Sequence, residues 1–168
     1  MDKKWILIII IIIASVGCGY LILDNSITVG HAVAVVDTSV ITIPEGFESE
    51  TAAGYDLELE NEKTNQTIDI KKLGKNNSVK LQIEKFGNKT SGFEKYLGNN
   101  TTKTPSGIEI FTGYYTNSSQ NFSTSFFYAQ NHTYVVNTTG YNNITKLNGD
   151  LECIVDTLRP DYKQSQDE

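Results

Sequence analysis

Residues that most often build active sites and metal sites are scarce in this sequence. Its 168 residues include two cysteines, two histidines, one tryptophan and three prolines. Cys18 falls inside an apolar run, so Cys153 has no intrachain partner and a disulfide framework is excluded. His31 and His132 belong to no nucleophile motif, and no phosphate loop, dinucleotide fingerprint or Cys/His metal spacing is present. We therefore expect no catalytic residue, no cofactor and no metal ligand.

Positive charge is also in short supply. The chain has 14 Lys and Arg against 20 Asp and Glu, which gives a formal net charge of −6. A nucleic-acid partner needs a basic surface, so that class of partner is excluded. The densest acidic region could attract calcium, but it lacks the fixed spacing of a calcium loop, and we interpret it as the solvated face of strands. Its members are Glu45, Glu48, Glu50, Asp56, Glu58, Glu60 and Glu62.

One long apolar run is present at Trp5–Leu23. These nineteen residues carry no charge and include eight consecutive aliphatic residues from Ile6 to Ile13. A helix of this length spans about 28 Å, close to the hydrocarbon thickness of a bilayer. Lys3 and Lys4 precede the run, which favours a cytoplasmic N-terminus and an exported remainder. We expect a single-pass cell-membrane protein anchored through residues 5–23, with its C-terminal domain outside.

Two other interpretations of the apolar run remain open. A cleaved signal peptide would normally have a shorter core and a nearby small-x-small site, whereas Ala32-Val33-Ala34 lies well beyond the run. A lipoprotein would use Cys18 as the lipidated residue, with Val16-Gly17 before it. Each of the three interpretations exports the rest of the chain.

Asparagine is frequent, and it is often followed two residues later by Ser or Thr. Ten Asn-x-Ser/Thr glycosylation sequons occur, where random order would give roughly three, and all follow the apolar run. A polar surface with incidental matches is the alternative to a glycan coat. The acceptors are Asn65, Asn76, Asn88, Asn99, Asn100, Asn117, Asn121, Asn131, Asn137 and Asn143.

Alternating apolar and polar residues predict strands after a stalk or edge strand at 24–38. A β-branched run at 39–43 ends at Pro44-Glu45-Gly46, a turn signal. Runs at 55–62, 67–73 and 78–86 alternate with period two and favour an antiparallel meander. Ser91-x-x-Glu94 reads as a capping box that opens a short helix ending near Gly98, followed by a loop at 99–105.

Aromatic residues concentrate in three further predicted strands, at 108–115, 122–130 and 132–138. A tight hairpin is expected at Gln130-Asn131. Aromatics of this density usually fill the core between a sheet and a helix, but Tyr114, Tyr115 and Phe127 are candidate ligand-facing residues.

The clearest helix lies at 142–158. Its apolar residues recur at helical spacing, Asn142 or Asn143 can cap its start, and Pro160 ends it. Cys153 falls on the edge of this helix as a half-buried packing residue. Residues 161–168 form a polar tail.

The order of these elements, with IPEGF at 43–47, a strand centred near Gly107 and DTLR at 156–159, resembles the Mog1/PsbP-like fold over residues 39–160. Members of that family often end a first strand with I-P-x-G-F/W and close with a helix finishing near S/T-Leu/Phe-Arg. The family has no shared catalytic set, so the resemblance implies a fold and no functional residue. The anchor, the sequons and the Ile/Asn/Lys bias also resemble small surface proteins of methanogenic archaea.

We therefore predict an α+β protein with four parts. These are a cytoplasmic tip and transmembrane helix at 1–23, a stalk at 24–38, an exported domain at 39–160 and a tail at 161–168. The domain would hold an antiparallel sheet of six or seven strands packed by a short helix and the C-terminal helix. The leading function is a non-enzymatic envelope or partner-binding protein with an unidentified envelope protein or glycan as partner. The alternatives are a glycan or small-ligand binding module using the aromatic strands and, third, an enzyme.

Overall fold

The computed structural model describes residues 32–50, 54–74, 78–87 and 95–160. Its elements follow in the order β1 (Val33–Val36), β2 (Ser39–Thr42), β3 (Glu48–Glu50), β4 (Leu57–Asn61), β5 (Gln66–Leu73), α2 (Val79–Gly87), β6 (Lys95–Lys103), β7 (Glu109–Thr116), β8 (Asn121–Ala129), β9 (His132–Thr139), α3 (Ile144–Thr157) and β10 (Arg159–Pro160). The predicted anchor lies outside the described residues. Across the ranges given above, no helix is long and apolar enough to cross a membrane.

Two antiparallel sheets organise the described part of the chain. The larger has seven strands in the order β3-β4-β5-β9-β8-β7-β6, and the smaller has three in the order β1-β2-β10. The α+β class and a main sheet of seven antiparallel strands are as predicted. The separate small sheet was not predicted, although the 24–38 segment was expected to supply an edge strand and β1 lies in it.

Local patterning accounts for the strands at the centre of the main sheet. Leu57 and Leu59 in β4, and Ile68 and Ile70 in β5, are buried, while their neighbours in sequence are more exposed. The predicted hairpin between β8 and β9 is confirmed: Gln130 and Asn131 have φ of 50° and 62°. Both central residues of a type I′ turn have positive φ, and its twist matches that of the paired strands.

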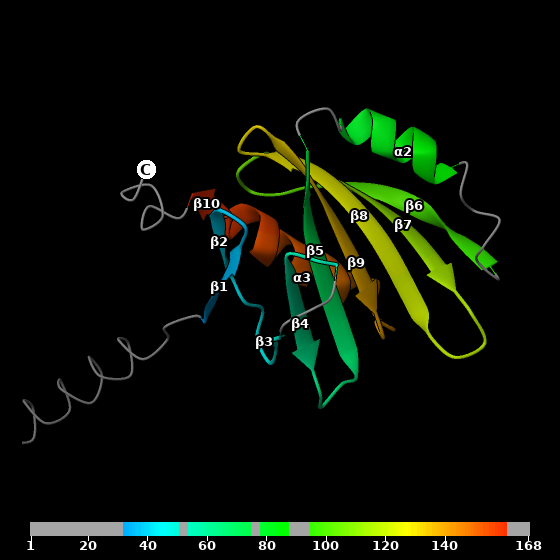
Figure 1. Ribbon diagram of the computed structural model, residues 1–168. Helices are drawn as coiled ribbons and strands as arrows, with labels where there is room; N and C mark the ends of the chain where they lie inside the picture. Colours follow the sequence, from blue (N-terminus) through cyan, green and yellow to red (C-terminus); the bar gives the residue numbers. More distant parts are fainter. Residues whose placement is uncertain (1–31, 51–53, 75–77, 88–94, 161–168) are drawn as a thin grey trace, which may run out of the picture. The chain divides into compact units, whose positions relative to one another are not determined.

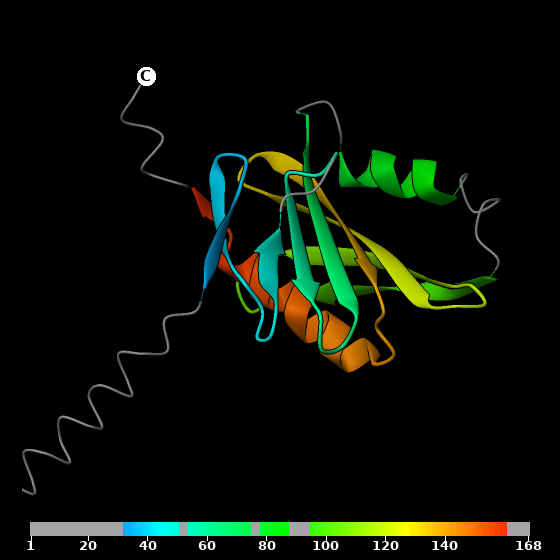
Figure 2. The same ribbon diagram turned by 60° about the horizontal axis from the view of Figure 1, so that its bottom comes forward.

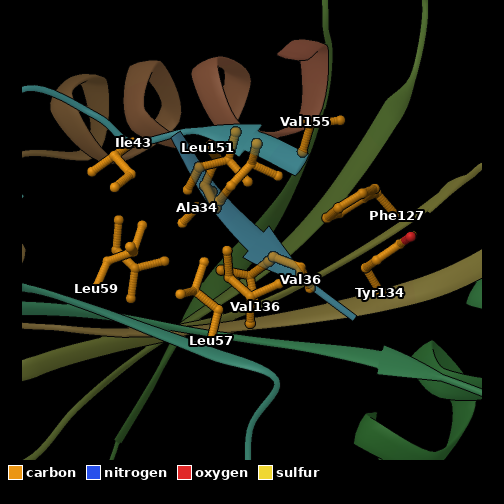
Figure 3. Close-up of a cluster of buried hydrophobic side chains, with 14 of the residues drawn as sticks. Ala34, Val36, Ile43, Leu57, Leu59, Phe127, Tyr134, Val136, Leu151 and Val155 are labelled. Atoms are coloured by element: carbon orange, nitrogen blue, oxygen red, sulfur yellow. The ribbon is translucent and has the colours of Figure 1, made fainter. Parts of the chain in front are cut away.

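Helix α3 covers one face of the main sheet. Asn143 caps its start, because the Asn143 side-chain oxygen accepts hydrogen bonds from the backbone N–H groups of Thr145 and Lys146. The apolar stripe of α3 is buried and comprises Leu147, Leu151, Ile154 and Val155. Figure 3 shows Leu151 and Val155 among core side chains from β1, β4, β8 and β9. Burying one such side chain contributes about 1.5–3 kcal/mol, so this helix is a principal source of the domain's stability.

The small sheet is joined to both α3 and the main sheet. The backbone N–H of Thr42 donates to the Thr157 hydroxyl at 2.9 Å, and Ser39 Oγ lies 3.2 Å from Tyr134 Oη. Ala34 and Val36 of β1 enter the common core. The small sheet therefore closes the end of the domain near the C-terminus of α3.

The strand predicted at 78–86 is wrong: these residues form helix α2. Ser78 starts the helix, since its Oγ accepts the Leu81 N–H at 3.2 Å and its carbonyl accepts the Gln82 N–H at 3.0 Å. The place beside β5 that a third meander strand would have taken belongs to β9. Because β9 takes that place, the backbone N–H and C=O groups of residues 79–87 bond to one another within a helix. The helix packs on β8, on the side of the main sheet away from α3 (Figure 2).

The short helix predicted from Ser91 to Gly98 is also wrong over the described residues 95–98, as is the loop predicted to follow it. Strand β6 runs from Lys95 to Lys103 along the edge of the sheet and pairs with β7 on both sides of a β-bulge at Leu97. Gly98, with φ of 130°, lies at a β-bulge and not at a helix end. Pairing with β7 outweighs the capping-box pattern that favours a helix, because the pairing gives hydrogen-bond partners to the backbone groups along one edge of the strand.

Candidate functional site

A cavity of about 290 Å³ opens where the start of α3 meets the ends of β7, β8 and β9. Residues from five segments of the chain contribute to it: β6, β7, β8, β9 and the β9–α3 connection with the first turn of α3. The lining consists of Leu97, Tyr114, Tyr115, Asn121, Phe122, Ser123, Thr138, Tyr141, Asn142, Ile144 and Leu147. We call this the α3 pocket.

Among the described residues, none that lines the α3 pocket is charged. Aromatic and aliphatic side chains predominate, and hydroxyl and amide groups supply its polarity. Leu97 and Ile144 form part of the lining and remain 52% and 57% exposed, which places them at the mouth of the pocket. A neutral group with an apolar face therefore fits this site better than an ion.

A β-bulge brings Leu97 to the pocket. Tyr96 pairs with Tyr115 and Gly98 pairs with Tyr114, so Leu97 is the extra residue between them. Bulges often re-aim a side chain in this way. The sequence signal for the bulge was Gly98, whose φ of 130° suits glycine, but the segment had been interpreted as a helix.

Hydrogen bonds hold the polar groups of the pocket in place. Ser123 Oγ and Thr138 Oγ1 lie 2.7 Å apart on neighbouring strands and are buried. At the mouth, Asn121 Nδ2 donates to Asn142 Oδ1 at 3.0 Å. That bond uses the nitrogen of one amide and the oxygen of the other, so Asn121 Oδ1 and Asn142 Nδ2 are the groups that a ligand would meet.

Tyr141, a lining residue, belongs to a network at the first turns of α3 in which Asp150 is buried and Lys146 is exposed. Tyr141 Oη donates to Asp150 Oδ2 at 2.7 Å, and Lys146 Nζ approaches both carboxylate oxygens at 2.7 and 2.8 Å. Burial, followed by the hydrogen bond to Asp150, raises the pKa of the Tyr141 hydroxyl. Tyr141 therefore stays neutral and fixed as one wall of the pocket.

The three predicted ligand-facing aromatics have different surroundings. Tyr114 lines the pocket, its Oη donates to Asn148 Oδ1 at 3.4 Å, and burial raises its pKa. Tyr115 is also a lining residue, but it follows Tyr114 in β7 and its ring points to the opposite face of the sheet, where it stacks on Phe122 at 6.0 Å; burial, then nearby Tyr96, raises its pKa to about 12. Phe127 is fully buried, stacked 5.1 Å from Tyr134 in the core, and does not reach the pocket.

Tyr141, Phe122 and Ile144 are among the lining residues that the sequence does not mark as ligand-facing, and of these Phe122 turns its ring to the opposite face of the sheet, against Tyr115. Phe122 stood among the aromatics of a predicted strand, and Ile144 was placed on the buried stripe of the helix. No local pattern distinguishes these residues from core residues, because their exposure depends on how the first turn of α3 meets the sheet.

The described sequons differ in their exposure. Asn65, Asn99, Asn100, Asn131 and Asn143 are exposed, whereas Asn117, Asn121 and Asn137 are partly buried. Asn76 and Asn88 lie outside the described residues. Three sequons adjoin the α3 pocket, because Asn121, Thr138 of the Asn137 sequon and Ile144 of the Asn143 sequon line it.

Several acidic residues face one another across the β3–β4–β5 ladder. Glu48 lies opposite Glu60, Glu50 opposite Glu58, and Glu58 opposite Asp69. Burial, then the charge of Glu58, raises the pKa of Asp69 to about 6. Over the ranges that the structure describes, no group of three or more His, Cys, Asp or Glu is placed to hold a metal ion.

The remaining candidates for chemistry lie apart from the pocket. His132 Nδ1 is 2.8 Å from the Gln130 carbonyl, in a shallow hollow shared with Asp37, Asp56 and Lys72; His31 lies outside the described residues. Lys72 is paired with Asp37 at 2.6 Å. Cys153 is half-buried, as predicted, and burial raises the pKa of its thiol, which disfavours the reactive thiolate.

Comparison with known proteins gives a likeness in fold. No family model and no curated protein sequence matches this chain. The solution structure of the cyanobacterial PsbP protein (CyanoP) from Synechocystis sp. PCC 6803 is similar, with a TM-score of 0.47 and 10% sequence identity, covering 77% of this chain and 90% of that chain. The likeness concerns the course of the chain and extends to no activity, partner or site residue.

Proposed function

We propose that this chain is a membrane-anchored, exported binding protein without enzymatic activity, and that its α3 pocket takes one ring of a neutral sugar. The observation that carries the proposal is the pocket itself: its described lining has no charged residue, includes Tyr114 and Tyr141, and has two exposed apolar residues at the mouth. Among the predicted functions, this geometry favours the glycan or small-ligand binding module over an envelope protein with no ligand site.

The size and polarity of the pocket narrow the ligand class. At about 290 Å³ the pocket is at the lower end of the roughly 300–1,000 Å³ typical of ligand sites, which suits one ring rather than a chain of rings. Aromatic side chains present flat apolar faces, and sugar rings carry apolar C–H faces beside their hydroxyls. Asn121 Oδ1 and Asn142 Nδ2 at the mouth would accept from and donate to ring hydroxyls. A charged ligand would lose its hydration without gaining an ion pair.

The location proposed for this function follows from the sequence. The Trp5–Leu23 run would anchor the chain with its N-terminus in the cytoplasm, and residues 24–168 would face outside, where glycans are accessible. An origin among small surface proteins of methanogenic archaea belongs to the same proposal. Protease treatment of whole cells tests the topology, since an exported domain is digested and a cytoplasmic one is protected.

The ligand proposal is tested by NMR titration of the full chain, made without glycosylation and held in detergent. Neutral hexoses and N-acetylhexosamines are the probes, and glucuronic acid is the charged comparison. We expect neutral sugars to shift the resonances of Tyr114, Thr138 and Tyr141 with a dissociation constant of about 1 mM, the range expected of a single ring. If none of the neutral sugars moves these resonances, the proposal is wrong.

A pair of substitutions separates the pocket from the rest of the surface. Leu97→Asp places a charge at the mouth and should weaken binding severalfold. Val33→Asp makes a similar change on β1 at nearly equal exposure, 53% against 52%, and away from the pocket lining, so it should leave binding unchanged. Equal effects of the two variants would point to a general change in the protein and not to the pocket.

A further inference from the structure

We propose that, of the sequons adjoining the α3 pocket, Asn143 is the one that carries a glycan, and that this glycan stands over the pocket mouth and restricts access to it. The inference rests on the proposed export and adds regulation to the proposed ligand site. It follows from three observations: how the Asn143 amide is held, how the competing amides are held, and what lies on either side of Asn143.

The helix cap holds the Asn143 amide by its oxygen, and glycosylation takes place at the nitrogen. Its Oδ1 accepts from Thr145 N at 2.9 Å and from Lys146 N at 3.2 Å, and the residue is exposed. Both contacts use the oxygen, so the cap leaves Nδ2 available. A glycan attached to Nδ2 keeps the amide carbonyl, and the helix cap survives the modification. The sequon Asn143-Ile144-Thr145 is thus compatible with the folded domain.

The transfer itself is an ordinary substitution at a sugar carbon. A membrane glycosyltransferase would supply a lipid-linked sugar phosphate or pyrophosphate. Asn143 Nδ2 forms a bond to the anomeric carbon, the bond from that carbon to the phosphate oxygen breaks, and the lipid phosphate leaves with the electron pair. One Nδ2 proton passes to a base of the transferase. The product carries an N-linked sugar and no redox change occurs.

The other two sequon asparagines beside the pocket use their side-chain nitrogen atoms in hydrogen bonds. Asn121 Nδ2 donates to Asn142 Oδ1 at 3.0 Å, and Asn137 Nδ2 donates to Tyr55 Oη at 3.2 Å in the middle of β9. A sugar that replaces a proton on either nitrogen would lie against the hydrogen bond that this nitrogen makes in the folded domain. Asn117 is held by its oxygen, as Asn143 is, but neither of its immediate neighbours in sequence lines the pocket, whereas both neighbours of Asn143 do.

The position of Asn143 puts its first sugar at the pocket. Asn142 and Ile144, the residues on either side of it, both line the pocket, and Ile144 is exposed at the mouth together with Leu97. A sugar on Asn143 therefore emerges between two lining residues. Its apolar face can cover Ile144 and Leu97, which would shield the mouth and compete with a free ligand.

A pair of substitutions at Thr145 tests the modification. Thr145 is exposed and is not a lining residue, and its contact with Asn143 is made by its backbone N–H, which both substitutions keep. Thr145→Ala destroys the sequon, and Thr145→Ser keeps it. The full chain is isolated from membranes of its native host, and glycopeptides are measured by mass spectrometry. We expect the peptide containing Asn143 to carry a glycan in the original chain and in Thr145→Ser, and to be bare in Thr145→Ala. A bare Asn143 in the original chain overturns the proposal.

Shielding of the mouth is measured separately. Leu97→Cys is combined with each Thr145 variant, and the rate of modification of residue 97 by N-ethylmaleimide is followed by peptide mass spectrometry. We expect labelling to be severalfold faster in the Thr145→Ala background than in Thr145→Ser. Equal rates refute the shielding. If the unglycosylated chain binds no sugar but the rates differ, the proposed ligand is wrong while the shielding stands.

Discussion

Asp69 offers a sharp test of the structure, because its environment makes its ionisation depend on the fold. It lies on β5 opposite Glu58 of β4 on one side and Asn137 of β9 on the other, and it is partly buried. Burial, then the negative charge of Glu58, raises its pKa from 3.8 to about 6. Both causes disfavour the ionised carboxylate in the folded state.

The sign of the pH dependence follows directly. A carboxyl group with a raised pKa holds its proton to higher pH in the folded chain than in the unfolded chain. Its contribution to the free energy of unfolding is fully present below pH 3.8 and is lost as the pH rises through about 6. Asn cannot ionise, so Asp69→Asn should leave stability almost unchanged near pH 3.5 and raise it above pH 6.

Solvent limits how much Asp69→Asn can raise the free energy of unfolding. A pKa of about 6 against 3.8 corresponds to roughly 3 kcal/mol if neither cause is screened. Asp69 is partly exposed, and water and salt weaken its repulsion with Glu58, so we expect about 1 kcal/mol for Asp69→Asn at pH 7.5. Urea unfolding of the full chain in detergent, followed by circular dichroism between pH 3.5 and 8, measures this difference.

A second aspartate supplies a control of opposite sign. The hydrogen bond from Lys72 lowers the pKa of Asp37. The stabilisation that the Asp37 carboxylate gives the folded chain is therefore present above the pKa of the unfolded chain, and it is lost as the pH falls through the pKa of the folded chain. Asp37→Asn should therefore destabilise the chain at neutral pH and have no effect in acid. A stability gain from Asp69→Asn that is independent of pH, or largest in acid, would refute the reasoning, as would a carboxyl NMR titration of Asp69 with a midpoint near 4.

Two further predictions concern packing. Leu151 lies on the buried stripe of α3, and Leu151→Ala should lower the free energy of unfolding by about 2–5 kcal/mol, seen as a lower urea midpoint with an unchanged slope; a loss below about 1 kcal/mol would mean that α3 does not pack as described. Gly140→Ala should be severely destabilising, since φ is 78° and the new Cβ would lie 2.2 Å from the Asn65 carbonyl oxygen, whereas Gly149→Ala, in open space on α3, should stabilise by about 1 kcal/mol. Thermal unfolding of the two glycine variants in parallel checks both signs, and a tolerated Gly140→Ala would contradict the turn geometry.

Several elements could be predicted because local patterns and tertiary structure agree. The alternation of Leu57 and Leu59, the Gln130-Asn131 turn and the apolar stripe of α3 each specify an element without reference to distant residues. The 79–87 segment fits both periods, since Val79, Leu81 and Ile83 alternate while Val79 and Ile83 also share a helical face. Only the pairing of β5 with β9 decides between strand and helix there.

The polar strand β6 shows the opposite case. Its sequence, KYLGNNTTK, has no apolar alternation, and eight of its backbone positions are paired with β7. An edge strand of this kind is specified by its neighbour more than by itself, so sequence reasoning assigned it to a helix and a loop. Leu97 was not predicted as a pocket residue for the same reason, because the bulge in β6 is what brings it to the pocket.

The sequence by itself determined the class of the protein: an uncharged run of nineteen residues before an acidic, cysteine-poor, sequon-rich α+β chain with aromatic strands and a capped C-terminal helix. These features depend on composition and on neighbours within one turn or one strand. Tertiary structure alone decided which aromatics face a cavity. Tyr114 lines the α3 pocket and Phe127 fills the core, although both are aromatic strand residues on neighbouring strands. The difference arises because α3 covers Phe127 and its stacked partner Tyr134, whereas beside Tyr114 the first turn of α3 leaves a space.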